Sequence, residues 1–436
     1  MKKILAIATM AALAAGAFAE GITFGSWGRG LFVVSNGYDE AEDENIVTGD
    51  INQSWGGNAP RTALAIHGDS ENVGFALDIH SNGYSLGQGD NAYIYVKPLP
   101  IVTAYLGKLD VNVLRSDAAY GLWAWDRLGY VGSFGEGAIF PDLLDRNLSV
   151  VATPVEGLTI GAAVNTGLDG TQTNIKNLFG NNSAAALGYT IPGVGTVKLG
   201  IHGNNNGVNE ELDEEIAYTT INAAFEYTGV ENLYAAIGIQ TPSAKKVYGW
   251  TKTAATEDSY EWAALATPDY GDESTAGAGY WKKTAATDAG WKYTDDDGNP
   301  IAAQTPTINL YARYKADAAT IHFSGTIKLF CDDIEEGDIG EDGNALGFYV
   351  GAGVDYDLGE GLGVFADIRY ANGIWTQSSS ADNTDNLVLG FGVQKGFSNG
   401  VLGVAFEGST NSNGRNKYDG DDVFAWEIPV KFEYWF

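Results

Sequence analysis

The sequence contains a single cysteine, Cys331, and few basic residues for a chain of 436 residues. One cysteine excludes an intrachain disulfide, even in an oxidising compartment. The 25 Lys and Arg residues stand against 56 Asp and Glu residues, so the formal net charge is −31. Nucleic acid is therefore not an expected partner, because binding to phosphates requires clustered basic side chains.

Long hydrophobic runs are also missing beyond the first residues. After residue 19, no stretch reaches the roughly 18 consecutive apolar residues that a membrane-spanning helix needs. In hydrocarbon every backbone N–H and C=O must find a partner within the protein, so strands can cross a bilayer only as a closed barrel. The chain is then either a soluble exported protein or a barrel, and the patterning of its strands must decide.

The first residues resemble a secretory signal peptide. Lys2 and Lys3 precede an apolar stretch, and Ala17-Phe18-Ala19 has the small residues of a cleavage site. We expect residues 1–19 to be removed and the mature chain to begin at Glu20. No cysteine lies near this cut, which disfavours a lipid-anchored lipoprotein.

Apolar side chains alternate with polar or small ones along most of the mature chain, which is the period of a β-strand. The last segment shows it clearly, with one face made of Phe424, Trp426, Ile428, Val430, Phe432, Tyr434 and Phe436. Its other face carries Glu427, Lys431 and Glu433. One face suits lipid and the other suits water. Glycine, alanine, serine and isolated charges on the polar faces indicate a wet, crowded lumen.

Short turns rich in Gly, Pro, Asn and Asp alternate with longer polar segments, as do the periplasmic turns and outer loops of membrane barrels. Counting the apolar runs between these connections predicts about 18 antiparallel strands, or about 16 if one pair is misread. Such a barrel would form one domain over residues 20–436. A soluble β-sandwich does not explain the alternation of connection lengths.

The terminal residues Phe432-Glu433-Tyr434-Trp435-Phe436 resemble the C-terminal strand of bacterial outer-membrane porins. In that family Phe432, Tyr434 and Phe436 would form the signal read by the barrel-insertion machinery. The resemblance implies an all-β, transmembrane, up-and-down barrel in the outer membrane of a diderm bacterium. It further implies passive diffusion of small polar solutes without a cofactor, and it leaves a homotrimer open. No porin subfamily matches, so the family's functional residues are not carried over.

An alternative function is that of a surface adhesin or receptor barrel acting through its long outer loops. The longest connection, 241–305, contains a near-repeat, in which residues 248–256 resemble residues 280–287. This loop could bind a partner or cover the pore, or it could be a duplicated surface loop without a dedicated partner.

The third long connection, 110–146, is the candidate constriction, because the third outer loop of general porins folds into the channel. Opposed acids and bases at a narrow point would orient polar solutes. The candidate residues are Arg115, Asp117, Trp123, Trp125, Asp126 and Arg127. The segment could instead be an ordinary packed surface loop. The tryptophans could stack on the rings of sugar solutes, but packing within the loop is the favoured role.

Strand phase predicts a second set of residues that face the lumen. On the lipid face near mid-membrane, an Arg or Lys would cost about 2 to 4 kcal/mol, so the interior is preferred. The set is Arg29, Arg313, His322, Asp367 and Arg369.

No metal site or catalytic site is expected. The acidic clusters at 39–44, 295–297 and 332–342 do not have EF-hand spacing, and the four histidines lie in separate strands. His80 and Ser81 are adjacent, so they point to opposite faces of their strand. Asp78 and His80 share a face, but the second carboxylate pair that a barrel protease would need is not evident.

Overall fold

The computed structural model describes seventeen segments of the chain: 21–39, 44–52, 60–82, 85–117, 138–164, 183–209, 214–243, 249–253, 259–264, 279–284, 290–294, 306–331, 344–372, 385–410, 417–418, 421–422 and 424–436. The segment 1–19, expected to be a signal peptide, lies outside them. Among the described residues no helix is long and apolar enough to cross a membrane. The chain divides into a main unit (1–245, 305–329 and 346–436) and a small unit (246–304 with 330–345).

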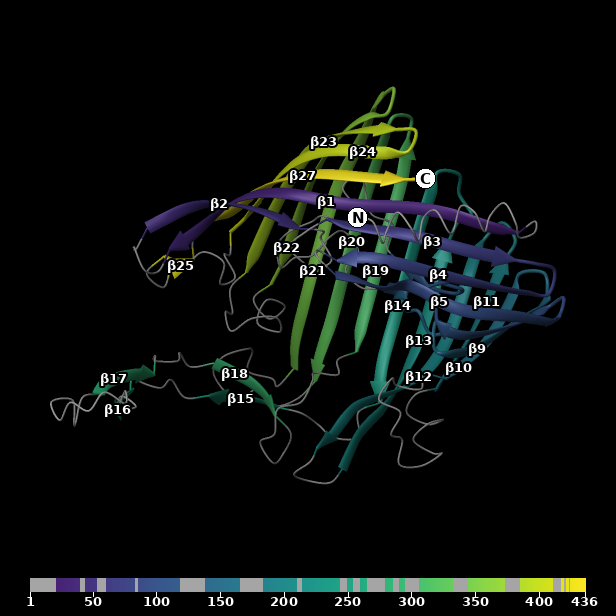
Figure 1. Ribbon diagram of the computed structural model, residues 1–436, viewed down its shortest axis with the longest axis horizontal. Coiled ribbons are helices and arrows are strands. Elements are labelled where there is room, and N and C mark those ends of the chain that lie inside the picture. Colours follow the sequence, from purple (N-terminus) through teal and green to yellow (C-terminus); the bar gives the residue numbers. More distant parts are fainter. Residues whose placement is uncertain are drawn as a thin grey trace, which may run out of the picture. The chain divides into compact units, whose positions relative to one another are not determined.

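The main unit contains one 19-stranded antiparallel sheet (Figure 1). Its strands are β1 (Ile22–Asp39), β2 (Glu44–Asn52), β3 (Arg61–Asp69), β4 (Val73–Asn82), β5 (Ser85–Leu99), β6 (Val102–Lys108), β9 (Leu148–Val155), β10 (Leu158–Val164), β11 (Ser183–Ile191), β12 (Gly195–Asn209), β13 (Glu214–Tyr227), β14 (Leu233–Ser243), β19 (Thr307–Ala316), β20 (Ala319–Cys331), β21 (Asn344–Gly359), β22 (Leu362–Ala371), β23 (Asn386–Phe397), β24 (Gly400–Ser409) and β27 (Ala425–Trp435).

The sheet closes on itself where β27 returns to β1. These two strands pair from Trp27 opposite Trp435 to Ser35 opposite Glu427. On its other side β1 pairs with β3 through its first half and with β2 through its second half. Two strands thus share one position, and the nineteen strands form a closed barrel of 18 positions. The sequence-based prediction of an 18-stranded up-and-down barrel is confirmed.

The two faces of the sheet differ as the alternation predicts. On β20, the side chains of Ile321 and Phe323 are 53% and 44% exposed, although both are large and apolar. Between and beside them, His322 and Ser324 are buried. Every strand of a closed barrel has its backbone groups paired, so an apolar outer face can meet lipid at no hydrogen-bonding cost. The main unit is therefore a transmembrane barrel, and an even-stranded barrel of this kind belongs to a bacterial outer membrane.

Tight turns connect the strands at one end of the barrel. Between β19 and β20, Ala316 pairs with Ala319, which leaves Asp317 and Ala318 as a two-residue turn. Asp317 has φ of 50°, a conformation that Asp and Asn tolerate and that two-residue hairpin turns require. The first residues of β1 and the last of β27 lie at this same end, which is periplasmic in outer-membrane barrels.

The small unit consists, in its described part, of two short antiparallel ladders. β15 (Gly249–Thr253) pairs with β18 (Gly290–Thr294), and β16 (Ser259–Ala264) pairs with β17 (Gly279–Thr284). The second ladder is nested within the first along the sequence. Parts of both near-repeat segments in the loop 241–305 therefore form strands.

Candidate functional site: the inner face of the barrel

The segment 110–146 places a compact apolar group against the inner face of the barrel. Its described parts are 110–117 and 138–146, joined by the pairing of β7 (Ser116–Asp117) with β8 (Ala138–Phe140). We call its buried apolar residues the inner cluster, which comprises Leu114, Ile139, Phe140, Leu143 and Leu144. Phe140 has no exposed surface.

The inner cluster packs on side chains, mostly alanines, that point inward from neighbouring strands. Those strands run from β9 to β14 and include β19, and we call their inner face the apolar half of the lumen. Its packing residues are Val151, Ala163, Ala184, Ala186, Ala224, Ala236 and Tyr311. Glycines complete the fit, because a Cβ built on Gly238 would collide with the backbone carbonyl of Ile139. A Cβ on Gly200 would likewise collide with the side chain of Leu143.

A buried lysine ties the segment to the wall. Lys198 on β12 donates from Nζ to the hydroxyl of Ser116 at 2.6 Å. The same ammonium lies 3.1 Å from Oε1 of Glu226 on β13, and its side chain is 9% exposed. A charge-assisted hydrogen bond of this kind adds orientation to the apolar contact.

The residues proposed for the constriction lie mostly beyond the described part of the chain. Arg115 donates from Nη1 to Oδ1 of Asn112 at 3.2 Å, within the segment itself. Asp117 belongs to β7. Trp123, Trp125, Asp126 and Arg127 lie outside the described residues.

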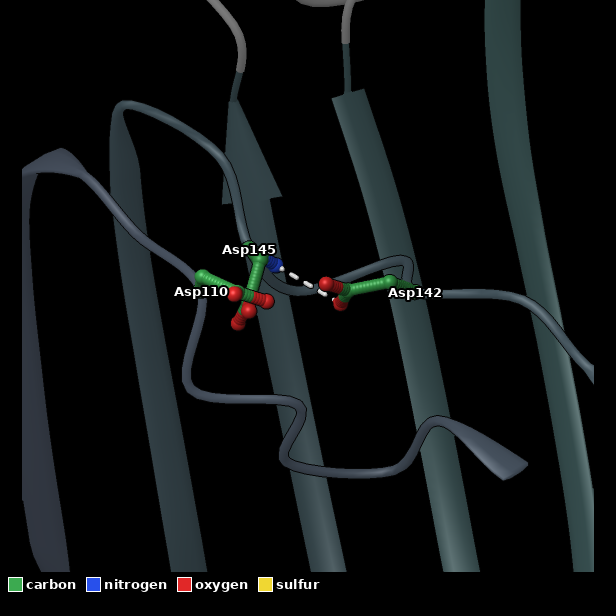
Figure 2. Close-up of side chains that lie close together, drawn as sticks. All are labelled: Asp110, Asp142 and Asp145. Carbon is green, nitrogen blue, oxygen red and sulfur yellow. Dashed lines mark hydrogen bonds between the residues drawn. The ribbon is translucent and has the colours of Figure 1, made fainter. Parts of the chain in front are cut away.

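Three carboxylates meet where the two described parts of the segment come together (Figure 2). Oxygens of Asp110, Asp142 and Asp145 lie within 4.8 Å of one another. The backbone N–H of Asp145 donates to Asp142 Oδ1 at 3.1 Å, and that of Asn112 donates to Asp145 Oδ2 at 2.8 Å. Burial, followed by the hydrogen bond and the charge of Asp145, raises the pKa of Asp142 to about 7.

No pattern in the sequence indicates this triad, because Asp110 is separated from the other two carboxylates by most of the segment. The acidic runs considered from the sequence lie elsewhere. Each carboxylate could offer one oxygen to a cation. A raised pKa weakens that capacity, since a metal ligand must be deprotonated.

Paired charges occupy the inner face of the strands on both sides of the β1–β27 seam. These strands are β1, β3–β5, β22, β24 and β27, and we call their inner face the charged half. On β22 the fully buried Arg369 donates from Nε to Asp367 at 3.1 Å and from Nη2 to Glu407 of β24 at 2.8 Å. Arg29 on β1 donates from Nη2 to Glu433 at 3.0 Å. Lys431 lies 3.9 Å from the other oxygen of Glu433.

The residues considered for an acid–histidine pair also lie on the charged half. His80 accepts at Nδ1 from Nε of Arg61 at 3.0 Å, and Arg61 pairs with Asp90 at 2.9 Å. Asp78 instead accepts from the backbone and the side chain of Asn91, at 3.1 and 2.9 Å. Asp78 and His80 therefore hold different partners.

Arg313 and His322 lie near the short turns, on neighbouring strands. They are direct register partners across β19 and β20. The guanidinium carbon of Arg313 lies 5.8 Å from the centre of the Tyr234 ring. His322 contacts the hydroxyl of Tyr311 through Nδ1 at 2.7 Å and Asp355 Oδ2 through Nε2 at 2.6 Å.

The C-terminal aromatic residues lie on the outer face and at the seam. Phe432 and Phe436 are 57% and 77% exposed. The backbone of Phe436 exchanges hydrogen bonds with Ser26 of β1, at 2.7 and 3.2 Å. The last residue thus extends the ladder that closes the barrel.

Comparison with known proteins gives structural neighbours only. No family model matches the chain, and no curated relative matches it. Among solved structures, Acinetobacter baumannii OccAB4 shares 9% identity at a TM-score of 0.47, covering 96% of this chain and 99% of its own. Vibrio cholerae OmpT, an outer membrane protein, shares 11% sequence identity at a TM-score of 0.43, and the match covers 96% of this chain and 99% of that protein. Pseudomonas putida OprB shares 10% sequence identity at a TM-score of 0.43, and the match covers 95% of this chain and 94% of that protein.

These values are too low to carry an argument about activity. The assignment rests on the pairing that closes 18 positions, on the apolar outer face and on the polar groups turned inward. On those observations, the chain is an outer-membrane β-barrel.

Proposed function

We propose that this barrel is a porin-like channel through which small polar solutes diffuse passively across the outer membrane. The observation that carries the proposal is the unequal lining of the lumen. One half is covered by the inner cluster, and the other presents charged and hydrogen-bonded side chains. A charge inside a barrel costs little free energy where water or a paired group solvates it. The charged lining is therefore compatible with a water-filled passage.

We further propose that the segment 110–146 sets the width of the passage. The inner cluster anchors it to the apolar half, so its remaining residues would border the space next to the charged half. Arg115 and Asp117, with Trp123, Trp125, Asp126 and Arg127, remain the candidates for the narrow point. Solute choice would depend on the charges there rather than on the net charge of the chain.

Conductance of the folded protein in planar lipid bilayers tests the channel. We expect stable, step-like currents in potassium chloride. The double variant Phe140→Ser with Leu144→Ser should raise the single-channel conductance, because two polar side chains in the inner cluster would release the segment. Val388→Ser is the matched control, since Val388 is a buried inward side chain on β23, outside the inner cluster.

Absence of current from a preparation shown to be folded would overturn the channel. It would leave the surface alternative, for which the paired strands of the small unit provide the candidate contact region. Deletion of 249–294 should then abolish binding of a cell or phage while the barrel stays folded. A true channel should keep its conductance after that deletion.

The route of assembly is part of the same proposal. Phe432, Tyr434 and Phe436 would be read by the insertion machinery before the seam with β1 forms, since their side chains contribute to the outer face. Phe436→Ala should reduce the amount of inserted barrel in cells. The barrel that does insert should unfold at nearly the wild-type urea concentration, because the seam uses the backbone of Phe436.

A further inference from the structure

A second site lies in the lumen at the short-turn end, next to the apolar half, where Tyr234 both lines the site and packs against the buried cluster. There a cavity of about 710 Å³ is bordered by the turn before β14 and by the adjoining ends of β19, β20 and β21. Its ionisable and aromatic lining residues are Glu231, Tyr234, Arg313, Lys315, His322 and Asp355. The apolar residue Val230, in the turn before β14, borders the same space.

Two cations of this cavity are available to a solute. Arg313 and Lys315 are two residues apart on β19, so they point to the same face, and both are exposed. Within the part of the chain that the structure describes, no carboxylate forms an ion pair with either of them. The position of Arg313 over the Tyr234 ring orients the guanidinium without neutralising its charge.

The nearby acids are mostly engaged with other groups. Asp355 holds His322 at 2.6 Å. Glu226 accepts from Lys198 at 3.1 Å and from the hydroxyl of Tyr234 at 3.2 Å. Glu231 remains as the acid at the rim, in the turn before β14. The inner face of β19 thus presents two exposed cations, while one of the two carboxylates of the lining is held by His322.

We propose that this cavity binds small organic carboxylates as they pass the periplasmic end of the channel. A guanidinium offers two parallel N–H donors that match the two oxygens of a carboxylate, and Lys315 adds a third charged donor. Val230 would contact the carbon skeleton, which inorganic phosphate lacks. The passage of the solute rests on the proposed channel, but the binding itself does not.

Equilibrium binding tests the site in the folded, full-length protein in detergent. Succinate is the probe, titrated calorimetrically, with inorganic phosphate as the comparison ligand. We expect Arg313→Gln to weaken succinate binding about tenfold, the equivalent of one charge-assisted hydrogen bond of roughly 1.4 kcal/mol. Combining it with Lys315→Gln should remove measurable binding. Phosphate should bind more weakly than succinate.

Lys97→Gln is the matched control. Lys97 is also an inward lysine at the short-turn end, and its Nζ lies 5.0 Å from the centre of the Tyr95 ring. It differs in lying 4.0 Å from Asp69, whereas Arg313 and Lys315 form no ion pair with a described residue. The substitution changes the net charge equally, so it should leave succinate binding unchanged if the cavity is the site.

Bilayer currents separate this site from the proposed function. Succinate added on the short-turn side should reduce the potassium chloride current of the wild type and of Lys97→Gln, but not of Arg313→Gln with Lys315→Gln. Succinate binding without any current would overturn the channel and support the site. Normal current with no succinate binding, equal loss of binding in Lys97→Gln, or phosphate binding as tight as that of succinate would overturn the carboxylate site.

Discussion

The apolar half and the charged half of the lumen are built on the same strand alternation but differ in what their inner residues meet. On the apolar half, alanines and glycines leave room for the inner cluster, and the contact is buried and closely packed. On the charged half, arginines and carboxylates form ion pairs within a strand, between neighbouring strands, and from β22 to β24. The identity of an inward residue therefore reflects its local partner and not simply the presence of water.

The largest expected effect comes from breaking the buried charges on β22. Arg369→Met would leave Asp367 and Glu407 buried without their cation, which costs about 3 to 5 kcal/mol when one partner of a buried pair is removed. The urea concentration at the unfolding midpoint should fall accordingly. We expect no comparable loss from Arg313→Met, because that side chain is exposed and forms no ion pair with a described residue.

A triple variant tests whether charge is the cause. Arg369→Met combined with Asp367→Asn and Glu407→Gln removes all three charges, so most of the lost stability should return. If the triple variant were as unstable as Arg369→Met alone, packing around the arginine stem, rather than its pairing, would explain the loss.

The apolar half should respond to added volume rather than to charge. Gly238→Ala would place a methyl group where the carbonyl of Ile139 lies, so the segment must shift. Overpacking of this kind costs about 1 to 3 kcal/mol, and here it should appear as weaker docking of the segment and a larger conductance. Gly87→Ala is the control, because a Cβ at Gly87 meets nothing within 4 Å.

Sequence alone predicted the barrel well because its main signal is local. Ile321, His322 and Phe323 alternate in the sequence as they do in exposure, and a short turn such as that at Asp317 carries a residue suited to its positive φ. The strand number followed from the same pattern. The one complication is that β2 and β3 share a place beside β1, which depends on register rather than on composition.

The inner face was less predictable, because its contacts join residues far apart in the sequence. Small residues on the polar strand faces indicated a crowded lumen, but nothing in those strands showed that Ile139 would lie against Gly238. Likewise, strand phase gave Arg369 an inward position without showing that Glu407 on another strand would pair with it. Alternation specifies a face, whereas partners depend on strand neighbours and loop paths.

The anchor of the segment should depend on pH. The pKa of Asp142 is raised to about 7 from its ordinary 3.8, so the docked segment holds a proton that the released segment gives up. Docking is then strongest below pH 3.8, weakens as the pH rises from about 4 to about 7, and is constant above that window. Conductance should rise with pH over this range in the wild type.

Asp142→Asn should remove most of this pH dependence, since an amide cannot release a proton. Arg115 and Arg146, together with Asp110 and Asp145, are the charged groups around the carboxyl. The effect should be smaller than that of Gly238→Ala, because Asp142 is partly exposed and water screens the repulsion. An unchanged pH profile in Asp142→Asn would assign the dependence to another group.

The smallest effect is expected at the seam of the charged half, at Arg29. Its partner Glu433 is 24% exposed and also lies 3.9 Å from Lys431, so Arg29→Gln leaves the carboxylate with water and a second cation. We expect a loss of about 1 kcal/mol in the free energy of unfolding, because the carboxylate that remains is partly exposed to water. Adding Lys431→Gln should enlarge the loss. If Arg29→Gln alone destabilised the barrel as much as Arg369→Met, the contrast between a fully buried pair and a solvated one would not hold within the charged half.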